Sequence, residues 1–195
     1  TPMIFNETSI QGVYIIDLEL LKDDRGFFAR TFCAQEFEER GLKPVVAQCN
    51  LSFNHKKGTL RGMHFQIPPA TETKLVRCTQ GAVYDVIVDL RKESPTYLSH
   101  VGVELSADNR RALYVPEMFA HGYQTLTDNA EVTYQVTEFY TPGYERGLRY
   151  SDPKLAIDWP LPVTTISNKD ANWPLLDNQP NDQQSDQPVS VGVPS

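Results

Sequence analysis

Cysteine is scarce in this chain of 195 residues, and its three copies follow no pattern. Cys33, Cys49 and Cys78 form neither an even set nor a CxxC pair. Their number argues against the disulfide framework of a small secreted domain, and their spacing offers no zinc site. We therefore expect a reducing, cytoplasmic environment and no bound metal.

Long hydrophobic runs are also missing. Hydrophobic residues make up 40 % of the chain, but no stretch approaches the ~20 apolar residues that a membrane-spanning helix needs. The first ten residues, TPMIFNETSI, lack the basic region and the apolar core of a secretory signal peptide. We expect a protein that makes no contact with membranes.

Positive charge is in deficit, since 18 Lys and Arg residues stand against 25 Asp and Glu residues, a formal net charge of -7. General nucleic-acid binding requires a basic surface, so this balance argues against a nucleic-acid partner. A local basic pocket on an acidic protein can still bind a small anion, and that class of ligand remains open.

The chain does contain many short apolar runs, rich in β-branched and aromatic residues and broken by Gly, Pro, Asn and Asp. The expected strands cover residues 12–20, 74–78, 82–90, 100–105, 111–116, 122–127 and 131–140. Turn signals separate them at Gln80-Gly81, Asp108-Asn109 and Asp128-Asn129. This spacing predicts an all-β sandwich or barrel. One segment, 33–42, predicts a short helix that ends at Gly41.

No internal repeat and no linker divides the body of the chain, so we expect a single domain over residues 1–176. The remaining residues, 177–195 (DNQPNDQQSDQPVSVGVPS), are almost purely polar with repeated proline. Such a segment buries too little apolar surface to offset the entropy of ordering it. We expect a disordered or loosely draped tail without catalytic residues.

Charged residues are unexpectedly dense in GTLRGMHFQIPPATETKLVRC (58–78), which otherwise suggests two neighbouring strands. Arg61 and His64 are three apart and would point to opposite faces of a regular strand, but a bulge at Gly62 would bring both to one face. Taken singly, each is most simply a solvent-exposed surface residue. Further polar residues along the chain favour a shared pocket: Lys74, His121, Tyr134, Tyr140, Lys169 and Asp170.

Ten motifs together resemble the dTDP-4-dehydrorhamnose 3,5-epimerases, and the resemblance runs from about residue 10 to 175. They are DDRGFF, QCN, GTLRGMHFQ, KLVRC, GAVYDVIVDLR, SPTY, YVPEMFAHGYQTL, YTPGYERGLRYSD, IDWPLP and SNKD. The resemblance implies a cupin-type jelly-roll β-sandwich with a few short helices and an enzyme that needs neither metal nor cofactor. It also implies a homodimer whose N-terminal strands join the partner's sheet.

The reaction implied by this resemblance inverts carbons 3 and 5 of a dTDP-linked 4-keto-6-deoxy-hexose, on either side of the ketone. Such an inversion needs a base, a stabilised enolate and an acid on the opposite face of the sugar. His64 matches the family's base and Asp170 the carboxylate that orients it. Lys74 matches the cation beside the enolate oxygen, and Tyr134 the acid.

Further positions match the family's contacts to the nucleotide diphosphate sugar. Arg25 and Arg61 suit a diphosphate because the guanidinium group presents forked donors. Tyr140 matches an aromatic residue that stacks on the base. The other matches are polar contacts: Gln48 and Asn50 near the nucleotide, and His121, Glu145 and Lys169.

Arg30 departs from the family's pattern, which has Glu at the second position after RGFF. A carboxylate accepts a hydrogen bond from a group such as the N3–H of thymine, whereas a guanidinium group only donates. Arg30 could serve a cytosine base, reach a phosphate or face solvent. We therefore hypothesise an altered or relaxed nucleotide preference, which affinities for dTDP, CDP and UDP would test.

Three alternatives remain beside the 3,5-epimerase. The first is a close variant that inverts one carbon only or acts on a CDP-linked sugar. The second is a metal-dependent cupin, although the usual His-x-His pair is replaced here by His64-Phe65-Gln66. The third is a non-catalytic sugar-nucleotide-binding module, which would need the arginines and aromatics but not a base and an acid together.

Overall fold

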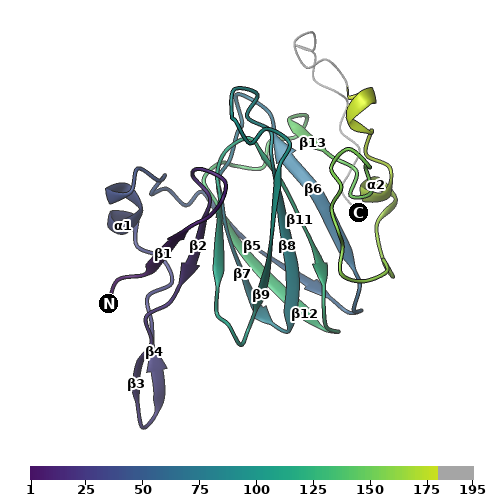
Figure 1. The fold of residues 1–195 in the computed structure, drawn as a ribbon. Helices are drawn as coiled ribbons and strands as arrows, with labels where there is room; N and C mark the ends of the chain where they lie inside the picture. The colour runs from purple at the N-terminus through teal and green to yellow at the C-terminus, as the bar shows by residue number, and fades with distance from the viewer. Residues whose placement is uncertain (180–195) are drawn as a thin grey trace.

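The computed structural model describes residues 1–179, which form two facing antiparallel β-sheets (Figure 1). In order, the first sheet contains β1 (Ile4–Glu7), β2 (Tyr14–Asp17), β10 (Ala112–Val115), β7 (Lys74–Gln80), β12 (Ala130–Val136) and β5 (Gln48–Asn54). The second contains β13 (Glu145–Gly147), β6 (Leu60–Gln66), β11 (Phe119–Thr125), β8 (Ala82–Asp89) and β9 (His100–Ser106). This arrangement confirms the predicted all-β jelly-roll sandwich.

Short helices and one hairpin complete the described chain. The helices are α1 (Ala34–Glu39), α2 (Asn168–Ala171) and the 3-10 helix η1 (Leu176–Asn178). The hairpin of β3 (Leu21–Asp23) and β4 (Gly26–Phe28) projects from the body below β1 (Figure 1). No helix among residues 1–179 is long and apolar enough to span a membrane.

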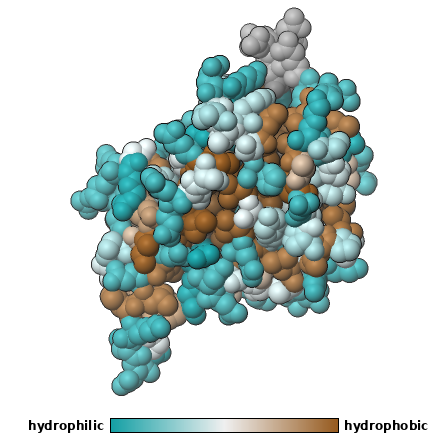
Figure 2. All heavy atoms as spheres, in the orientation of Figure 1, coloured by the Kyte–Doolittle hydropathy of each residue, from teal (hydrophilic) through white to brown (hydrophobic). Residues whose placement is uncertain are grey.

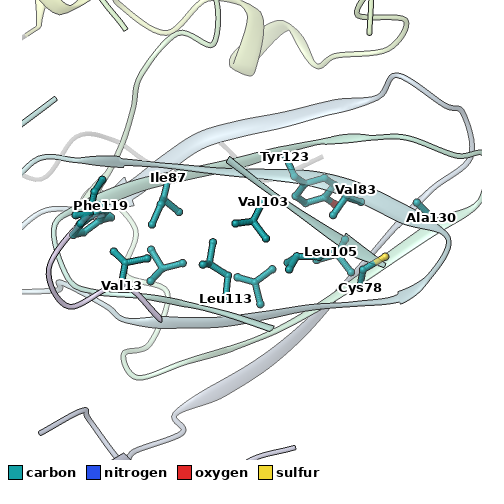
Figure 3. Packing of buried hydrophobic residues seen from close by; sticks show 14 residues of the cluster. Val13, Cys78, Val83, Ile87, Val103, Leu105, Leu113, Phe119, Tyr123 and Ala130 are labelled. Carbon is teal, nitrogen blue, oxygen red and sulfur yellow. The ribbon is translucent and has the colours of Figure 1, made fainter. Parts of the chain in front are cut away.

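Apolar residues on alternate positions of both sheets meet in the space between them. Cys78 and Leu113 of the first sheet belong to the same core cluster as Val83, Ile87 and Leu105 of the second sheet (Figure 3). Phe119 and Ala130 lie at opposite ends of this cluster. Outward-facing residues are covered as well: Val86 and Val88 pack under Leu148 and Leu155, and Leu75 and Tyr114 pack under Phe37 of α1. Strands buried on both faces explain why several runs are almost continuously apolar.

Two of the predicted turns and the predicted helix end are confirmed. Gly81 and Asn129 adopt positive φ angles of 70° and 53° in the turns between strands, as their sequence signals indicated. The helix ends as predicted, because Gly41 takes a φ of 71° and its N–H and that of Leu42 bond the carbonyls of Glu38 and Phe37.

Several strand boundaries were wrong. The segment predicted as one strand over 131–140 leaves the sheet after Val136, and the run 12–20 contributes only four residues to β2. Five short or polar strands were not predicted at all: β1, β3, β4, β5 and β13. Of the predicted tail, residues 180–195 lie outside the described residues. Its first residues, 177–179, are described, and the Gln179 side chain donates to the Pro174 carbonyl.

The bulge predicted at Gly62 is present. His64 pairs with His121, and Arg61 pairs with Tyr123, so three steps along β6 correspond to two along β11. Gly62 has a φ of 136°, and a Cβ atom there would lie 2.6 Å from the Cα of Gly122. Only glycine fits at this position. The bulge turns both Arg61 and His64 toward the face that Tyr123 shares with the core.

Candidate active site

A cavity of about 530 Å³ opens between the two sheets. Strands β5, β7 and β12 supply one side of it, and β6 and β13 supply the other. The lining residues are Gln48, Asn50, Leu51, His64, Phe65, Gln66, Glu72, Lys74, Tyr134, Val136, Tyr140 and Glu145. Seven of these were site candidates from the sequence, so the fold gathers most of the predicted group in one place.

His64 forms a short pair with a carboxylate from the far end of the chain. Its Nε2 lies 2.6 Å from Oδ1 of Asp170, although the two residues are 106 positions apart. Asp170 sits in α2, whose first turn is capped by Ser167. The carboxylate is buried, whereas about a third of the imidazole side chain is exposed to the cavity. The buried Asp170 carboxylate therefore holds the His64 ring in place while the ring stays accessible from the cavity.

Asp170 is kept ionised by its hydrogen bonds. Burial alone would raise its pKa, but hydrogen bonds from His64, the Gly62 amide and Trp173 outweigh burial and lower the pKa below its ordinary value. The Gly62 N–H donates to Oδ2 at 3.1 Å, and the Trp173 Nε1–H donates to Oδ1 at 3.1 Å. The bulge at Gly62 therefore turns His64 toward the cavity and also binds the Asp170 carboxylate that pairs with His64.

Lys74 and Tyr134 lie on the side of the cavity opposite His64. Lys74 is the cross-strand partner of Val136, two residues from Tyr134, so both side chains point to the inner face of the first sheet. Lys74 is buried, with its Nζ 3.5 Å from Oε1 of Glu72. Burial, followed by the charges of Tyr123 and Glu72, raises the pKa of Tyr134. Its phenol therefore stays protonated near neutral pH and can donate.

The exposed part of the cavity carries a polar cluster of Tyr140, Glu145, Lys169 and Gln48. Glu145 accepts from the Tyr140 hydroxyl at 3.2 Å and from Lys169 Nζ at 2.9 Å. The Gln48 side chain accepts from the Tyr140 amide at 2.8 Å. Because Tyr140 is 57 % exposed, its ring is available at the surface for stacking.

Arg61 and His121 lie beside the cavity rather than among its lining residues. Arg61 Nε donates to Asn54 at 2.7 Å, and Asn54 in turn donates to the Tyr123 hydroxyl. His121 Nε2 lies 2.7 Å from Oδ1 of Asp85, and this pair is buried. Since His121 is the cross-strand partner of His64, two His–Asp pairs stand next to each other on the inner face.

Arg25 and Arg30 are not brought to the cavity within one chain. Arg25 sits at the tip of the β3–β4 hairpin, exposed and paired with Asp23. Figure 1 places this hairpin on the opposite side of the molecule from β6 and α2. Arg30 follows β4 and is exposed.

Comparison with known proteins identifies the family. Residues 7–178 match the family described as dTDP-4-dehydrorhamnose 3,5-epimerase. The chain belongs to this family. The dTDP-4-dehydrorhamnose 3,5-epimerase of Methanothermobacter thermautotrophicus is 46 % identical over 178 residues, which cover 89 % of this chain and 95 % of that protein.

Two further members of the epimerase family bear on the reaction. A solved dTDP-6-deoxy-D-glucose-3,5-epimerase from Legionella pneumophila, in complex with dTDP-4-keto-L-rhamnose, has a TM-score of 0.85 at 41 % identity and covers 91 % of this chain and 94 % of that one. The dTDP-4-dehydrorhamnose 3-epimerase of Streptomyces niveus is 40 % identical over 168 residues, 86 % of this chain and 81 % of that protein. The family therefore includes enzymes named for one carbon as well as for two.

Gln66, which stands where a metal-dependent cupin would have a second histidine, is fully engaged in this family member. Its amide donates to the Ala70 carbonyl at 2.7 Å and accepts from the Thr141 N–H at 2.9 Å. Within residues 1–179, no group of three or more His, Cys, Asp or Glu side chains is arranged to hold a metal ion. The residue's role here is to fasten the segment that carries Tyr140.

Sequence reasoning missed Asp85 and Trp173. Asp85 is a fully buried carboxylate inside the apolar strand β8, and its Oδ2 has no hydrogen-bond partner among the described residues. Asp85 in the middle of the apolar run AVYDVIV was the available signal, because a buried carboxylate requires a partner. Trp173 follows α2 in an irregular segment, and no pattern in the sequence indicated its contact with Asp170.

Proposed function

We propose that this protein is a dTDP-4-dehydrorhamnose 3,5-epimerase, an isomerase that converts dTDP-4-dehydro-6-deoxyglucose to dTDP-4-dehydrorhamnose. The observation that carries the proposal is the placement of a paired imidazole, His64, and a protonated phenol, Tyr134, on opposite sides of one cavity. Inversion of a carbon requires proton removal on one face and proton return on the other. Because the two sheets lie on opposite sides of the cavity, one can present the base to one face of the sugar ring and the other can present the acid to the opposite face.

The reaction begins with His64, which takes the proton from the carbon next to the ketone. The electron pair of the broken C–H bond forms the enolate double bond, and negative charge develops on the oxygen at carbon 4. Asp170 stabilises the imidazolium that forms, and the ammonium group of Lys74 stabilises the enolate oxygen. Tyr134 then gives its proton to the opposite face of the same carbon. His64 releases its proton to solvent, and Tyr134 regains one from solvent. The same proton removal and return at the second carbon next to the ketone completes the double inversion.

The polar cluster at the exposed part of the cavity binds the nucleotide. Tyr140 offers a ring for the base, and Gln48 and Asn50 offer amides beside it. Lys169 and Arg61 supply positive charge for the diphosphate on a protein whose net charge is negative. His121 contacts the sugar from its place beside His64. Neither step of the chemistry requires a cofactor.

The active form is a homodimer, in which the hairpin that carries Arg25 and Arg30 reaches the partner's cavity. Support comes from apolar surface: Leu21, Phe27 and Phe28 of the hairpin are 47 %, 44 % and 64 % exposed, and Figure 2 shows this hydrophobic area above the hairpin's hydrophilic tip. The outer face of the first sheet supplies a second apolar area, with Leu51 58 % and Phe53 38 % exposed. A second copy would cover both areas.

The same outer face holds two polar atoms that a partner could satisfy. Arg77 Nη2 and Gln135 Oε1 are buried without a hydrogen-bond partner among the described residues. Both residues alternate with inward-facing Val76 and Tyr134, so they point away from the cavity. The three cysteines are unpaired, which suits the reducing cytoplasm as the site of action.

The nearest alternative is inversion of one carbon only, which the named activity of the Streptomyces niveus relative favours. Analysis of the product's configuration separates the two. The protein is incubated with dTDP-4-dehydro-6-deoxyglucose, the ketone is reduced with borohydride, and the released sugars are identified. Inversion at both carbons gives rhamnose and its carbon-4 epimer. Recovery of only the sugars expected from unchanged substrate, with wild type as with His64→Asn, would refute the proposal.

A further inference from the structure

Trp173 makes a direct hydrogen bond to the carboxylate that holds the proposed base. Its indole Nε1–H donates to Oδ1 of Asp170 at 3.1 Å. This is the same oxygen that lies 2.6 Å from His64 Nε2. The indole also meets the imidazole edge to face, with ring centres 6.0 Å apart and planes inclined by 69°. Trp173 therefore touches both members of the His64–Asp170 pair without lining the cavity.

A glycine makes room for this indole. Gly147 of β13 is the cross-strand partner of His64, so a side chain there would point to the same face as the imidazole. A Cβ atom at Gly147 would lie 2.2 Å from the Cδ2 and Cε2 atoms of Trp173, a distance that no side chain tolerates. The indole thus occupies the place where a side chain of Gly147 would stand.

The rest of Trp173 is fixed in position as well. Arg149 Nε donates to its carbonyl oxygen at 2.7 Å, and Lys169 Nζ lies 5.5 Å from the centre of its ring. A tryptophan held at its backbone, its ring face and its N–H has little freedom to turn. Its donor is therefore presented to Asp170 in one direction.

Resting on the epimerase function proposed above, we propose that Trp173 is a positioning residue for proton abstraction. It orients the Asp170 carboxylate toward His64 and limits how strongly that carboxylate stabilises the protonated imidazole. The indole N–H and the imidazole both bind Oδ1 of Asp170. Because the hydrogen bond from the indole partly neutralises the negative charge on this oxygen, the oxygen stabilises a protonated His64 less strongly. The Gly62 N–H holds the other oxygen and keeps the carboxylate from rotating.

The other charged or titratable groups around this pair stay in place when Trp173 is changed conservatively. On the same side stand His121 of β11 with Asp85 of β8, and Glu145 with Lys169. Across the cavity stand Lys74 with Glu72, and Tyr134. Lys169 is the member of this group that meets the Trp173 ring, and phenylalanine preserves a ring for it. A change in the pH profile of Trp173→Phe would therefore report the lost N–H.

The first test is kinetic and uses Trp173→Phe, which keeps an aromatic ring near Gly147 and removes the N–H donor together with part of the indole. The acid limb of kcat/KM should move upward by about half a pH unit or more, because the carboxylate then stabilises the imidazolium more strongly. On the acid limb a shift of half a unit alone lowers kcat/KM by up to about threefold, and this part of the loss should disappear at higher pH. An unshifted acid limb would overturn the inference, whether or not the rate falls.

A second pair of variants tests whether the effect passes through the indole. Gly147→Ala should displace the ring and shift the acid limb in the same direction. In a Trp173→Ala background the added methyl group meets empty space, so Gly147→Ala should add no further shift. An equal shift in both backgrounds would contradict the inference, because the glycine would then act by another route.

A spectroscopic test needs no substrate. The chain has two tryptophans, and Trp159 donates its Nε1–H to the Tyr150 carbonyl, away from the pair. In ¹H–¹⁵N spectra the Trp173 indole signal should move as the pH is lowered and His64 gains its proton, while the Trp159 signal stays still. The titration should vanish in His64→Asn. A stationary Trp173 signal in the wild type would refute the contact even in a protein that turns over substrate. Absence of turnover with an intact titration would instead count against the proposed function.

Discussion

His64 and Tyr134 line one cavity from opposite sheets, the imidazole from β6 and the phenol from β12. His64 is paired with a buried carboxylate, and Tyr134 has a raised pKa because partial burial of its side chain disfavours the charged form. A base and an acid that face each other across a space for a sugar ring account for an inversion without any redox step.

His64→Asn should abolish epimerisation while leaving nucleotide binding unchanged. A positioned general base contributes about 10²–10⁴-fold to a rate, and asparagine cannot take the proton. Turnover should fall by that factor in a product assay, whereas the affinity for dTDP measured by calorimetry should match the wild type. A rate within a few-fold of the wild type would show that His64 is not the base.

Tyr134→Phe should separate proton removal from inversion. His64 can still form the enolate, but the opposite face has lost its donor, so the proton returns mainly from the side of His64. In deuterium oxide the variant should exchange the hydrogens at carbons 3 and 5 with little change in configuration. Full inversion at the wild-type rate would assign the acid to another group.

Arg25 should act on the partner's cavity, and complementation between two inactive variants tests this. Arg25→Ala and His64→Asn are each expected to lose most activity. If the dimers exchange subunits at random, equal amounts of the two should regain about a quarter of the wild-type activity, because one site in each mixed dimer is intact. No recovery, although sedimentation shows mixed dimers, would place Arg25 outside the site.

Arg30 should influence which nucleotide is preferred. A guanidinium group donates hydrogen bonds only, so it favours a base edge or phosphate that accepts them. Affinities for dTDP, CDP and UDP should change relative to one another in Arg30→Ala, and Arg30→Glu should favour dTDP. A clear preference for dTDP that Arg30→Ala leaves unaltered would remove Arg30 from the account.

Asp89 should make the fold sensitive to acid. Burial alone would raise its pKa, but hydrogen bonds from Arg91, Ser94 and Thr96 lower the pKa to about 2 from an ordinary value of 3.8. The unfolded chain then binds a proton more readily than the folded one, so the free energy of unfolding falls as the pH drops through this window. Urea unfolding should show a shallower decline below pH 4 in Asp89→Asn, which should also lose about 1–3 kcal/mol at neutral pH. Parallel curves for both proteins would contradict this assignment.

The sandwich could be predicted from the sequence because most of its strands bury apolar residues and end at Gly, Asn or Asp. Strand β5, QCNLSFN, could not be predicted in this way. Its inward residues, Gln48 and Asn50, are polar because they face the cavity, and its apolar Leu51 and Phe53 point outward. A strand that lines a binding site has the reverse of the usual pattern, so hydrophobic periodicity overlooks it.

Some features of the candidate site could likewise be predicted from the sequence, and others could not. The turn of His64 toward the cavity followed from Gly62, because a strand with glycine at that position can form a bulge. The meeting of His64 with Asp170 came only from the family resemblance, since no local rule joins residues 106 positions apart. Asp85 and Trp173 depend on tertiary packing alone. The roles assigned to the thirteen predicted residues remain predictions.

Deuterium incorporation tests the central claim most directly. The wild-type protein is incubated in deuterium oxide with dTDP-4-dehydro-6-deoxyglucose, and the product is examined by NMR. The account predicts deuterium at carbons 3 and 5 with both centres inverted, and no incorporation with His64→Asn. Label at one carbon would restrict the reaction to that carbon. Absence of label at both carbons in the wild-type reaction would contradict proton abstraction by His64 and with it the proposed function.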